Sequence, residues 1–382
     1  MIRQILTFLF CLLLVSPRLA AQDAAGKKSV RMGVLLPLKE RTARGTKMVE
    51  FYRGLLMAVD SLKRDGVSVD VQALHAGSSA SEMDQMLASH ALKDCDVVFG
   101  PLDAAQLPAL ADYCYLHDIH LVVPFTSLAT QLIGHPRHYL VTAPRNRIQD
   151  EAVWYIQDQF SDYNIILVET NESNEEGTAF GERLRAAMSQ KGIYVRQLNL
   201  EADDLAFLQA FNPQRKNLII PNSPSLKALN NLTSKLKDFQ RAHSEYELAL
   251  FGYPAWQTYT QQLLPDFYQL NTYAYTTFYR NPLSQRNEAF DRQFMNWFHT
   301  PMSNTFPRYA LMGFDLGYFF LRGLAIYGRD RLTDAITQVP ARPYQHPFHF
   351  EQSGDGNGYV NTFVELIHYT PQQSIELITR NR

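Results

Sequence analysis

The sequence has few cysteines and almost no imbalance of charge. Three cysteines occur in 382 residues, and 36 basic residues nearly balance 38 acidic ones. This excludes a disulfide-rich scaffold and a polybasic nucleic-acid-binding protein. Long blocks of one charge, low-complexity tracts and obvious repeats are also missing. A chain of this length and composition predicts a globular protein with two lobes.

Catalytic signatures are missing as well. The chain lacks HExxH, a P-loop and GxSxG, and its three isolated HxxH pairs fall short of the three or four convergent ligands that a zinc site needs. No nucleophile–base motif is present. We therefore expect a protein that is not an enzyme and that uses no cofactor and no metal.

The N-terminus has the pattern of a secretion signal. Arg3 supplies a charged start, Ile5 to Val15 is apolar, and Leu19-Ala20-Ala21 fits a cleavage site. A membrane anchor is the alternative, but this apolar run is shorter than the roughly 20 residues that span a bilayer. Residues 1–21 are thus predicted to be a signal peptide, which implies export to the periplasm.

Two cysteines lie beyond this segment, Cys95 and Cys114. Cys95 begins an expected strand and Cys114 ends the helix that follows, and such a helix runs back along its strand. The two ends therefore share one edge of the sheet, so a disulfide is geometrically allowed in an oxidising compartment. Two buried free thiols are the alternative, and the sequence leaves both open.

The most informative stretch runs from Asp94 to Ser127. Two short apolar runs, 97–99 and 119–123, flank a helical pattern, and each run ends in a turn signal with small or hydroxyl residues. Short apolar strands that alternate with helices predict a parallel sheet covered on both faces. In such sheets ligands bind beyond the carboxyl ends of the strands.

The same rhythm of strands and helices occurs twice. Strands are expected first at 30–36, 67–74, 97–99, 119–123 and 138–143, and then at 164–169, 194–200, 217–221, 247–252 and 271–278. The tail, 348–376, alternates like β structure. The apolar run Tyr309 to Tyr327 contains Asp315 and Arg322, which predicts a buried helix rather than a membrane span.

Five segments, in this order, carry a resemblance to a known family. They read VRMGVLLPL, DCDVVFGPL, IHLVVPFTS, HYLVTAPRNRIQDEAV and FPRYALMGFDLGYFFLRGLAIYG. The chain resembles the type I periplasmic binding proteins, the leucine-binding-like and receptor ligand-binding-like family. The resemblance covers about Val30 to Leu377.

The resemblance implies an α/β fold of two Rossmann-like lobes with parallel central sheets, joined by a three-crossover hinge. We expect lobe 1 to comprise 30–145 plus 275–330, and lobe 2 to comprise 146–274 plus 331–382. The family motif also suggests that Asp315 caps or pairs at the hinge. A ligand would close between the lobes.

The resemblance also places a ligand site at the strand ends of both lobes. Backbone N–H groups, hydroxyls and an aromatic lid would hold the ligand there. The residues carried over are Leu102, Asp103, Phe125, Thr126 and Ser127 in the first lobe, and Thr170, Asn171, Asn222, Ser223, Tyr253 and Trp256 in the second.

This chain departs from the amino-acid-binding pattern at two places. Pro144-Arg145-Asn146-Arg147 at the crossover and Tyr253 to Trp256 at the turn offer no acid to hold a ligand ammonium. An unpaired ammonium is costly in a closed cleft. Arg145 and Arg147 are either a solvated hinge pair or guanidinium forks for an anionic ligand.

Two functions follow from these patterns. The first is a secreted solute-binding protein that delivers a small polar ligand to a membrane permease of an ABC-type uptake system. The ligand would be anionic if Arg145 and Arg147 bind it. The alternative is an envelope interaction domain, for example one that activates a peptidoglycan synthase, with an assembly protein as its partner. Neither function involves nucleic acid.

Overall fold

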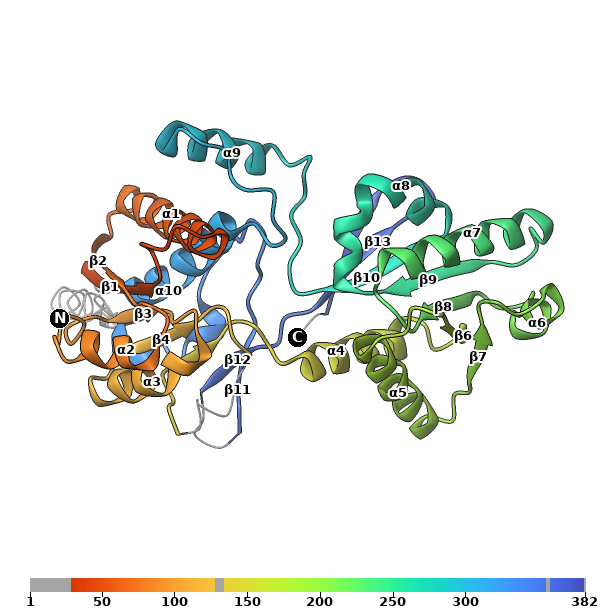
Figure 1. Cartoon of the computed structure of the whole chain (residues 1–382), viewed down its shortest axis with the longest axis horizontal. Helices are drawn as coiled ribbons and strands as arrows, with labels where there is room; N and C mark the ends of the chain where they lie inside the picture. The colour runs from red at the N-terminus through yellow and green to blue at the C-terminus, as the bar shows by residue number, and fades with distance from the viewer. Residues whose placement is uncertain (1–28, 128–133, 355–357, 381–382) are drawn as a thin grey trace, which may run out of the picture.

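The computed structural model describes residues 29–127, 134–354 and 358–380. The expected signal peptide, 1–21, lies outside the described residues. Figure 1 shows two lobes side by side, each with a central sheet and flanking helices. Both sheets have seven strands and are mostly parallel, so the predicted α/β class is confirmed.

The first sheet has the order β11-β12-β5-β4-β3-β1-β2. Its strands are β1 (Ser29–Leu36), β2 (Ser68–His75), β3 (Val97–Phe99), β4 (His120–Val123), β5 (His138–Leu140), β11 (Phe350–Gln352) and β12 (Tyr359–Asn361). The helices around it are α1 (Ala43–Arg64), α2 (Ala80–Leu87), α3 (Leu107–Leu116), α9 (Gln285–Phe298) and α10 (Tyr309–Arg331), with the short helices η1 (Ala104–Gln106) and η4 (Ile336–Gln338).

The second sheet has the order β14-β13-β10-β9-β8-β6-β7, and its five parallel strands repeat the arrangement of β5-β4-β3-β1-β2. The added pair differs, because β13 is antiparallel to β10 whereas β12 is parallel to β5. Its strands are β6 (Asn164–Glu169), β7 (Val195–Asn199), β8 (Asn217–Pro221), β9 (Leu248–Gly252), β10 (Thr272–Thr276), β13 (Glu365–Tyr369) and β14 (Ile375–Thr379). Its helices are α4 (Arg145–Gln159), α5 (Glu175–Gln190), α6 (Asp204–Ala210), α7 (Leu226–Ala242) and α8 (Thr260–Gln269), with the short helix η3 (Pro254–Tyr259).

The chain passes between the sheets three times. The first crossover, 141–144, joins β5 to α4, the second, 277–284, joins β10 to α9, and the third, 362–364, joins β12 to β13. The third crossover corrects one expectation, because residues 331–382 were assigned to the second lobe as a whole. β12 instead pairs in parallel with β5, so β11 and β12 extend the first sheet.

The apolar run that begins at Tyr309 forms α10 in the core of the first lobe. Leu316 and Phe320 share a buried cluster with Val34 of β1. By length and composition α10 alone among the described helices could span a membrane, yet 78% of its most apolar window is buried inside the protein. It is therefore the buried helix that the sequence predicts.

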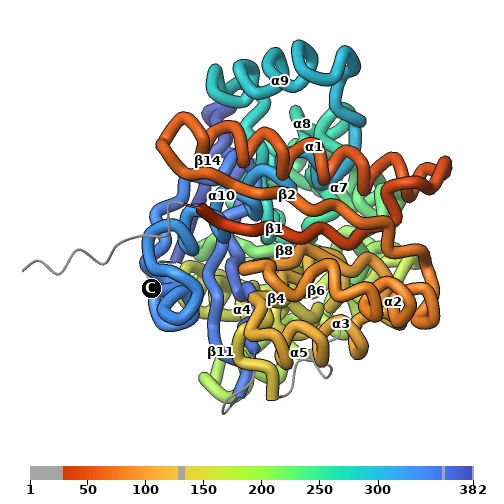
Figure 2. Tube along the Cα trace, turned by 90° about the vertical axis from the view of Figure 1, so that its left-hand side faces the viewer, coloured from red at the N-terminus to blue at the C-terminus, as the bar shows by residue number. Residues whose placement is uncertain are grey.

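Two glycines let α10 approach α1 closely. A Cβ on Gly54 would lie 1.9 Å from the carbonyl oxygen of Ala310, and a Cβ on Gly313 would lie 2.0 Å from that of Phe51. No side chain fits in these gaps, so backbone meets backbone. α9 then packs on the pair through Phe290 and Phe294, and Figure 2 shows it on the outer side of α1.

Cys95 and Cys114 are both buried and free. They share the small apolar cluster beneath β3 and α3. Burial raises the pKa of Cys95 to about 11 and raises that of Cys114 further. The structure therefore contains buried thiols in place of the disulfide, and both are poor nucleophiles.

Candidate functional site

The loops after β3 and β4 lie next to each other because these strands are parallel neighbours. Leu102 and Phe125 are half-buried and pack against the core of the first lobe. The Phe125 ring meets Phe51 edge-on, with centroids 5.0 Å apart. Thr126 is half-exposed and Ser127 is exposed, so the end of this loop is accessible from outside the lobe.

Asp103 does not present a free carboxylate. It forms an ion pair with Arg44 at the start of α1. This pairing neutralises the one acidic group of the predicted loop. A ligand cation would therefore have to compete with Arg44 for Asp103.

Three residues of the predicted second-lobe site are buried in this structure. Tyr253, Trp256 and Ser223 are each 0% exposed. Trp256 stacks on Phe267 with centroids 6.0 Å apart, and the Tyr253 hydroxyl donates to the Pro221 carbonyl at 2.6 Å. The short helix η3 turns both rings back into the core, so neither forms a lid in this conformation.

The remaining second-lobe residues form a small polar cluster at the ends of β6 and β8. The Asn222 side-chain oxygen accepts from the Thr170 backbone N–H at 2.9 Å and from its hydroxyl at 2.8 Å. Thr170 is buried, whereas the neighbouring Asn171 is exposed. These bonds fix the loop and occupy the Asn222 carbonyl.

Arg145 and Arg147 lie at the exposed first turn of α4. Arg147 reaches Glu351 of β11 at 3.8 Å, and their side chains are 55% and 40% exposed. This is the solvated arrangement that the sequence left open. The pair connects the first turn of the second lobe to the sheet of the first.

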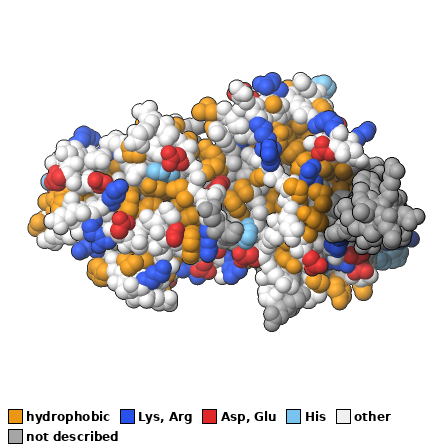
Figure 3. All heavy atoms as spheres, turned by 180° about the vertical axis from the view of Figure 1, so that it is seen from behind, with side chains coloured by type: hydrophobic (Ala, Val, Ile, Leu, Met, Phe, Trp, Pro, Cys, Tyr) orange, Lys and Arg blue, Asp and Glu red, His pale blue; other side chains and the backbone are white. Residues whose placement is uncertain are grey.

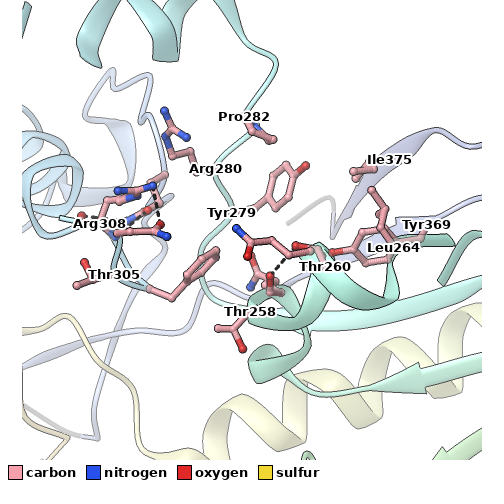
Figure 4. A pocket seen from close by; sticks show the side chains of 15 residues that line it. Thr258, Thr260, Leu264, Tyr279, Arg280, Pro282, Thr305, Arg308, Tyr369 and Ile375 are labelled. Atoms are coloured by element: carbon pink, nitrogen blue, oxygen red, sulfur yellow. Dashed lines mark hydrogen bonds between the residues drawn. The ribbon is translucent and has the colours of Figure 1, made fainter. Parts of the chain in front are cut away.

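The structure contains a cavity of about 600 Å³ beside the second crossover. Figure 4 shows its two walls. On the second-lobe side, Thr258, Thr260 and Leu264 come from η3 and α8, and Tyr369 and Ile375 from β13 and the start of β14. The facing wall is the segment before α10, including Thr305 and Arg308. None of the residues predicted from the sequence is among those that line it.

The second crossover forms the floor of this cavity. Tyr279 and Arg280 line it, and burial raises the pKa of Tyr279 to about 12, so its hydroxyl stays neutral. The Tyr279 backbone N–H donates to the Gln345 carbonyl at 3.0 Å. Tyr279 therefore belongs both to the connection between the lobes and to the floor of the cavity.

Asp315 holds the segment beside this crossover. Its carboxylate accepts backbone N–H bonds from Tyr344, Gln345 and His346 at 2.7–2.9 Å. The Gln345 side-chain oxygen in turn accepts from the Arg308 backbone N–H at 3.1 Å. Of the two roles suggested for Asp315, the structure shows capping: it holds the 344–346 segment, which contacts the second crossover through Gln345 and Tyr279.

Sequence reasoning missed the residues that line the cavity. Tyr279 and Arg280 follow β10 directly, so the rule used for the other strands would have found them. Arg308 and Phe306 lie just before α10, in a segment whose aromatic residues suggest core packing. No sequence signal links these two segments, because about 25 residues and α9 separate them. Among the described residues no group of acidic, histidine and cysteine side chains could hold a metal.

The sequence matches no protein-family model and no curated protein. Solved structures of transport proteins share its fold. A Rhodospirillum rubrum protein named for branched-chain amino acid ABC transport aligns with a TM-score of 0.63 at 14% identity, covering 92% of this chain and all of that one. A branched-chain amino acid ABC transporter ligand-binding protein from Burkholderia xenovorans aligns at 0.55 and 12% identity, covering 92% of this chain and 94% of its own.

A substrate-binding protein from Desulfitobacterium hafniense, solved in complex with leucine, aligns at a TM-score of 0.50 and 14% identity. It covers 92% of this chain and all of its own length. The chain thus has the fold of the type I periplasmic binding proteins over nearly its whole described length. Function must be argued from the site, since one fold hosts many functions.

Proposed function

We propose that the protein is a non-enzymatic solute-binding protein that closes its two lobes around a small polar ligand. The carrying observation is the cavity of about 600 Å³, which has one wall from each lobe and a crossover as its floor. This volume falls within the range of small-molecule sites, roughly 300–1,000 Å³. Because both lobes contribute, closure would bury the ligand.

The proposal extends to location and partner. A protein exported by its predicted signal would act in the periplasm, and a membrane permease of an ABC-type uptake system would receive the ligand. Figure 3 shows acidic and basic side chains interspersed over one face of the molecule. Such a face has no extended field of one sign to attract nucleic acid.

Two measurements test this function. A solute that fills the cleft should raise the melting temperature by mass action, and small-angle scattering should show a smaller radius of gyration in its presence. Free leucine and valine should bind weakly, because the described cavity lining contains no acidic residue for an ammonium group. Micromolar binding of either, measured by calorimetry, would contradict that expectation.

Three exposed apolar side chains favour the second function, an envelope interaction domain. Leu283, Met295 and Trp297, which lie just before α9 and on it, are 85%, 42% and 43% exposed. Exposed large apolar groups on one element suit a protein partner. If no solute changes the melting temperature while Trp297→Ala abolishes association with an envelope protein, this function replaces transport.

A further inference from the structure

The cavity at the second crossover has an uneven charge. Its described lining contains two arginines, Arg280 and Arg308, and no aspartate or glutamate. Arg280 is paired outside the lining with Asp291 of α9 at 2.6 Å. The charge of Arg280 is therefore balanced by Asp291, which leaves Arg308 as the second arginine of the lining.

Among the described residues, the guanidinium of Arg308 donates hydrogen bonds only to neutral groups. Its guanidinium donates to the Ser303 carbonyl at 2.5 Å and to the Asn304 side chain at 2.9 Å. Burial, and next the charge of Arg280, lower the pKa of Arg308. The charges of Asp291 and Glu50 act in the opposite direction on this pKa, but neither carboxylate forms an ion pair with Arg308 among the described residues. The neutral bonds therefore hold the guanidinium in place without a direct ion pair, and an anion in the cavity could bind it.

The remaining lining offers apolar surface. Phe306 is 52% exposed although it lines the cavity, and Leu264, Pro282 and Ile375 line it as well. Figure 4 shows Arg280 and Arg308 close together on one side, and Leu264 and Ile375 across the cavity from them. A molecule with a charged end and an apolar body would satisfy both sides at once.

We propose that the ligand is an organic anion with an apolar body, whose charged group binds Arg308, with Arg280 beside it, and whose body lies against Phe306. This inference rests on the proposed solute-binding function and narrows its ligand class. It assigns the recognition of charge to the second crossover and the segment before α10. Arg145 and Arg147, at the exposed start of α4, have no part in it.

A pair of fluorescent probes that differ in charge tests the proposal. Anilinonaphthalene sulfonate has an apolar aromatic body and one negative charge, and phenylnaphthylamine is the same body without the charge. Fluorescence titration of the full chain should show saturable binding of the sulfonate. Arg308→Gln should weaken it about tenfold or more, and should change the affinity for phenylnaphthylamine less than about threefold.

Three further variants act as controls. Phe306→Ala should weaken both probes, since it removes the apolar surface and leaves the charge. Arg308→Lys should retain part of the sulfonate affinity, because it keeps the charge and loses the fork. Arg292→Gln removes an exposed arginine of α9 that does not line the cavity, and it should change neither affinity. The melting temperature of each variant shows that it is folded.

Failure of this inference is distinguishable from failure of the proposed function. Absence of saturable sulfonate binding overturns the ligand class, and so does equal loss of both probes in a folded Arg308→Gln variant. If, in that case, some other solute still raises the melting temperature of both the parent and Arg308→Gln, the protein is a solute binder for another class. If no solute does so, the solute-binding function falls too.

Discussion

The five parallel strands of each lobe have the same order, but the two lobes present different surfaces at their strand ends. In the first lobe, Thr126 and Ser127 remain accessible after β4. At the equivalent place in the second lobe, Tyr253 and Trp256 after β9 are completely buried. The comparison shows that residues after a strand can contact a ligand only if they are not packed into the hydrophobic core.

The lobes also differ in how their helices pack. α1 and α10 touch through backbone at Gly54 and Gly313 in the first lobe. In the second lobe, α5 has Gly181, where a Cβ would make an ordinary contact of 3.5 Å with Leu167. In the first lobe glycine thus brings two helices together, whereas in the second lobe Gly177 of α5 brings a helix against the loop after β8, where a Cβ would lie 2.0 Å from the Asn222 carbonyl oxygen.

The largest expected effect breaks the first-lobe packing. Gly54→Ala would place a Cβ 1.9 Å from the Ala310 carbonyl oxygen, so α1 and α10 would have to separate. We expect a loss of more than about 4 kcal/mol of unfolding free energy. Gly181→Ala in α5 is the matched control and should stabilise by about 0.5–1 kcal/mol. Urea unfolding measures both, and equal effects would remove the contrast between the lobes.

The second prediction concerns the aromatic core of the second lobe. Trp256→Ala should cost about 3–5 kcal/mol of stability, because the ring is fully buried against Phe267 and Gly252. Phe306→Ala, at an exposed ring, should stay within about 0.5 kcal/mol of the parent. Urea unfolding of both variants is the measurement. A stable Trp256→Ala protein with weakened ligand binding would restore the lid hypothesis.

Two buried carboxyls allow a comparison by pH. Burial raises the pKa of Glu365, on β13, to about 7, and no donor among the described residues reaches it. Its carboxyl binds a proton more tightly when folded than when unfolded, where the pKa is about 4.5. The associated stability is complete below about pH 4.5 and is lost as the pH rises through about 7.

Glu365→Gln should therefore flatten this pH dependence and stabilise the protein at pH 8 by about 2–3 kcal/mol. In the first lobe, burial likewise raises the pKa of Asp315 to about 7, but Asp315→Asn should cost about 1–3 kcal/mol at neutral pH. Its carboxylate serves three backbone N–H donors, and an amide has only one acceptor oxygen for them. Unfolding curves at several pH values decide the case. Parallel curves for Glu365→Gln and the parent contradict the assignment.

The smallest expected effect is at the surface. Arg44→Gln removes the ion pair with Asp103, whose side chains are 43% and 23% exposed. We expect a change within about 1 kcal/mol that shrinks further at high salt. Lys237→Gln removes a pair with Asp266 in the second lobe, at 27% and 20% exposure. Its effect should be slightly larger, and thermal melts at two salt concentrations test the order.

Local patterns allowed much of the fold to be predicted. The strand from Val30, the loop after Gly100 and the buried helix from Tyr309 all depend on apolar runs and turn residues close in sequence. α8 is hard to recognise from sequence because Pro265, which is unfavourable within a helix, lies inside it. The tail was misassigned because Tyr359 pairs with Tyr139, more than 200 residues away, and alternation along a strand does not reveal its neighbour.

The candidate site was less predictable than the fold. Thr126 and Ser127 remain strand-end candidates, but the cavity joins a crossover to a segment beyond α9. The direction in which η3 turns Trp256 depends on packing against Phe267, which follows it in α8. This tertiary packing cannot be predicted from the local sequence around Trp256, on which its assignment to a ligand surface was based.

The position of Tyr279 and Arg280 has a consequence for regulation. These residues are part of the chain that must rotate when the lobes change their angle, and they also touch whatever fills the cavity. Ligand occupancy of the cavity and the angle between the lobes are therefore thermodynamically linked. A solute can favour the closed population only by the difference between its affinities for the two angles. Two solutes of equal affinity could thus produce very different closed fractions, and a receptor that recognises the angle would respond to one and ignore the other.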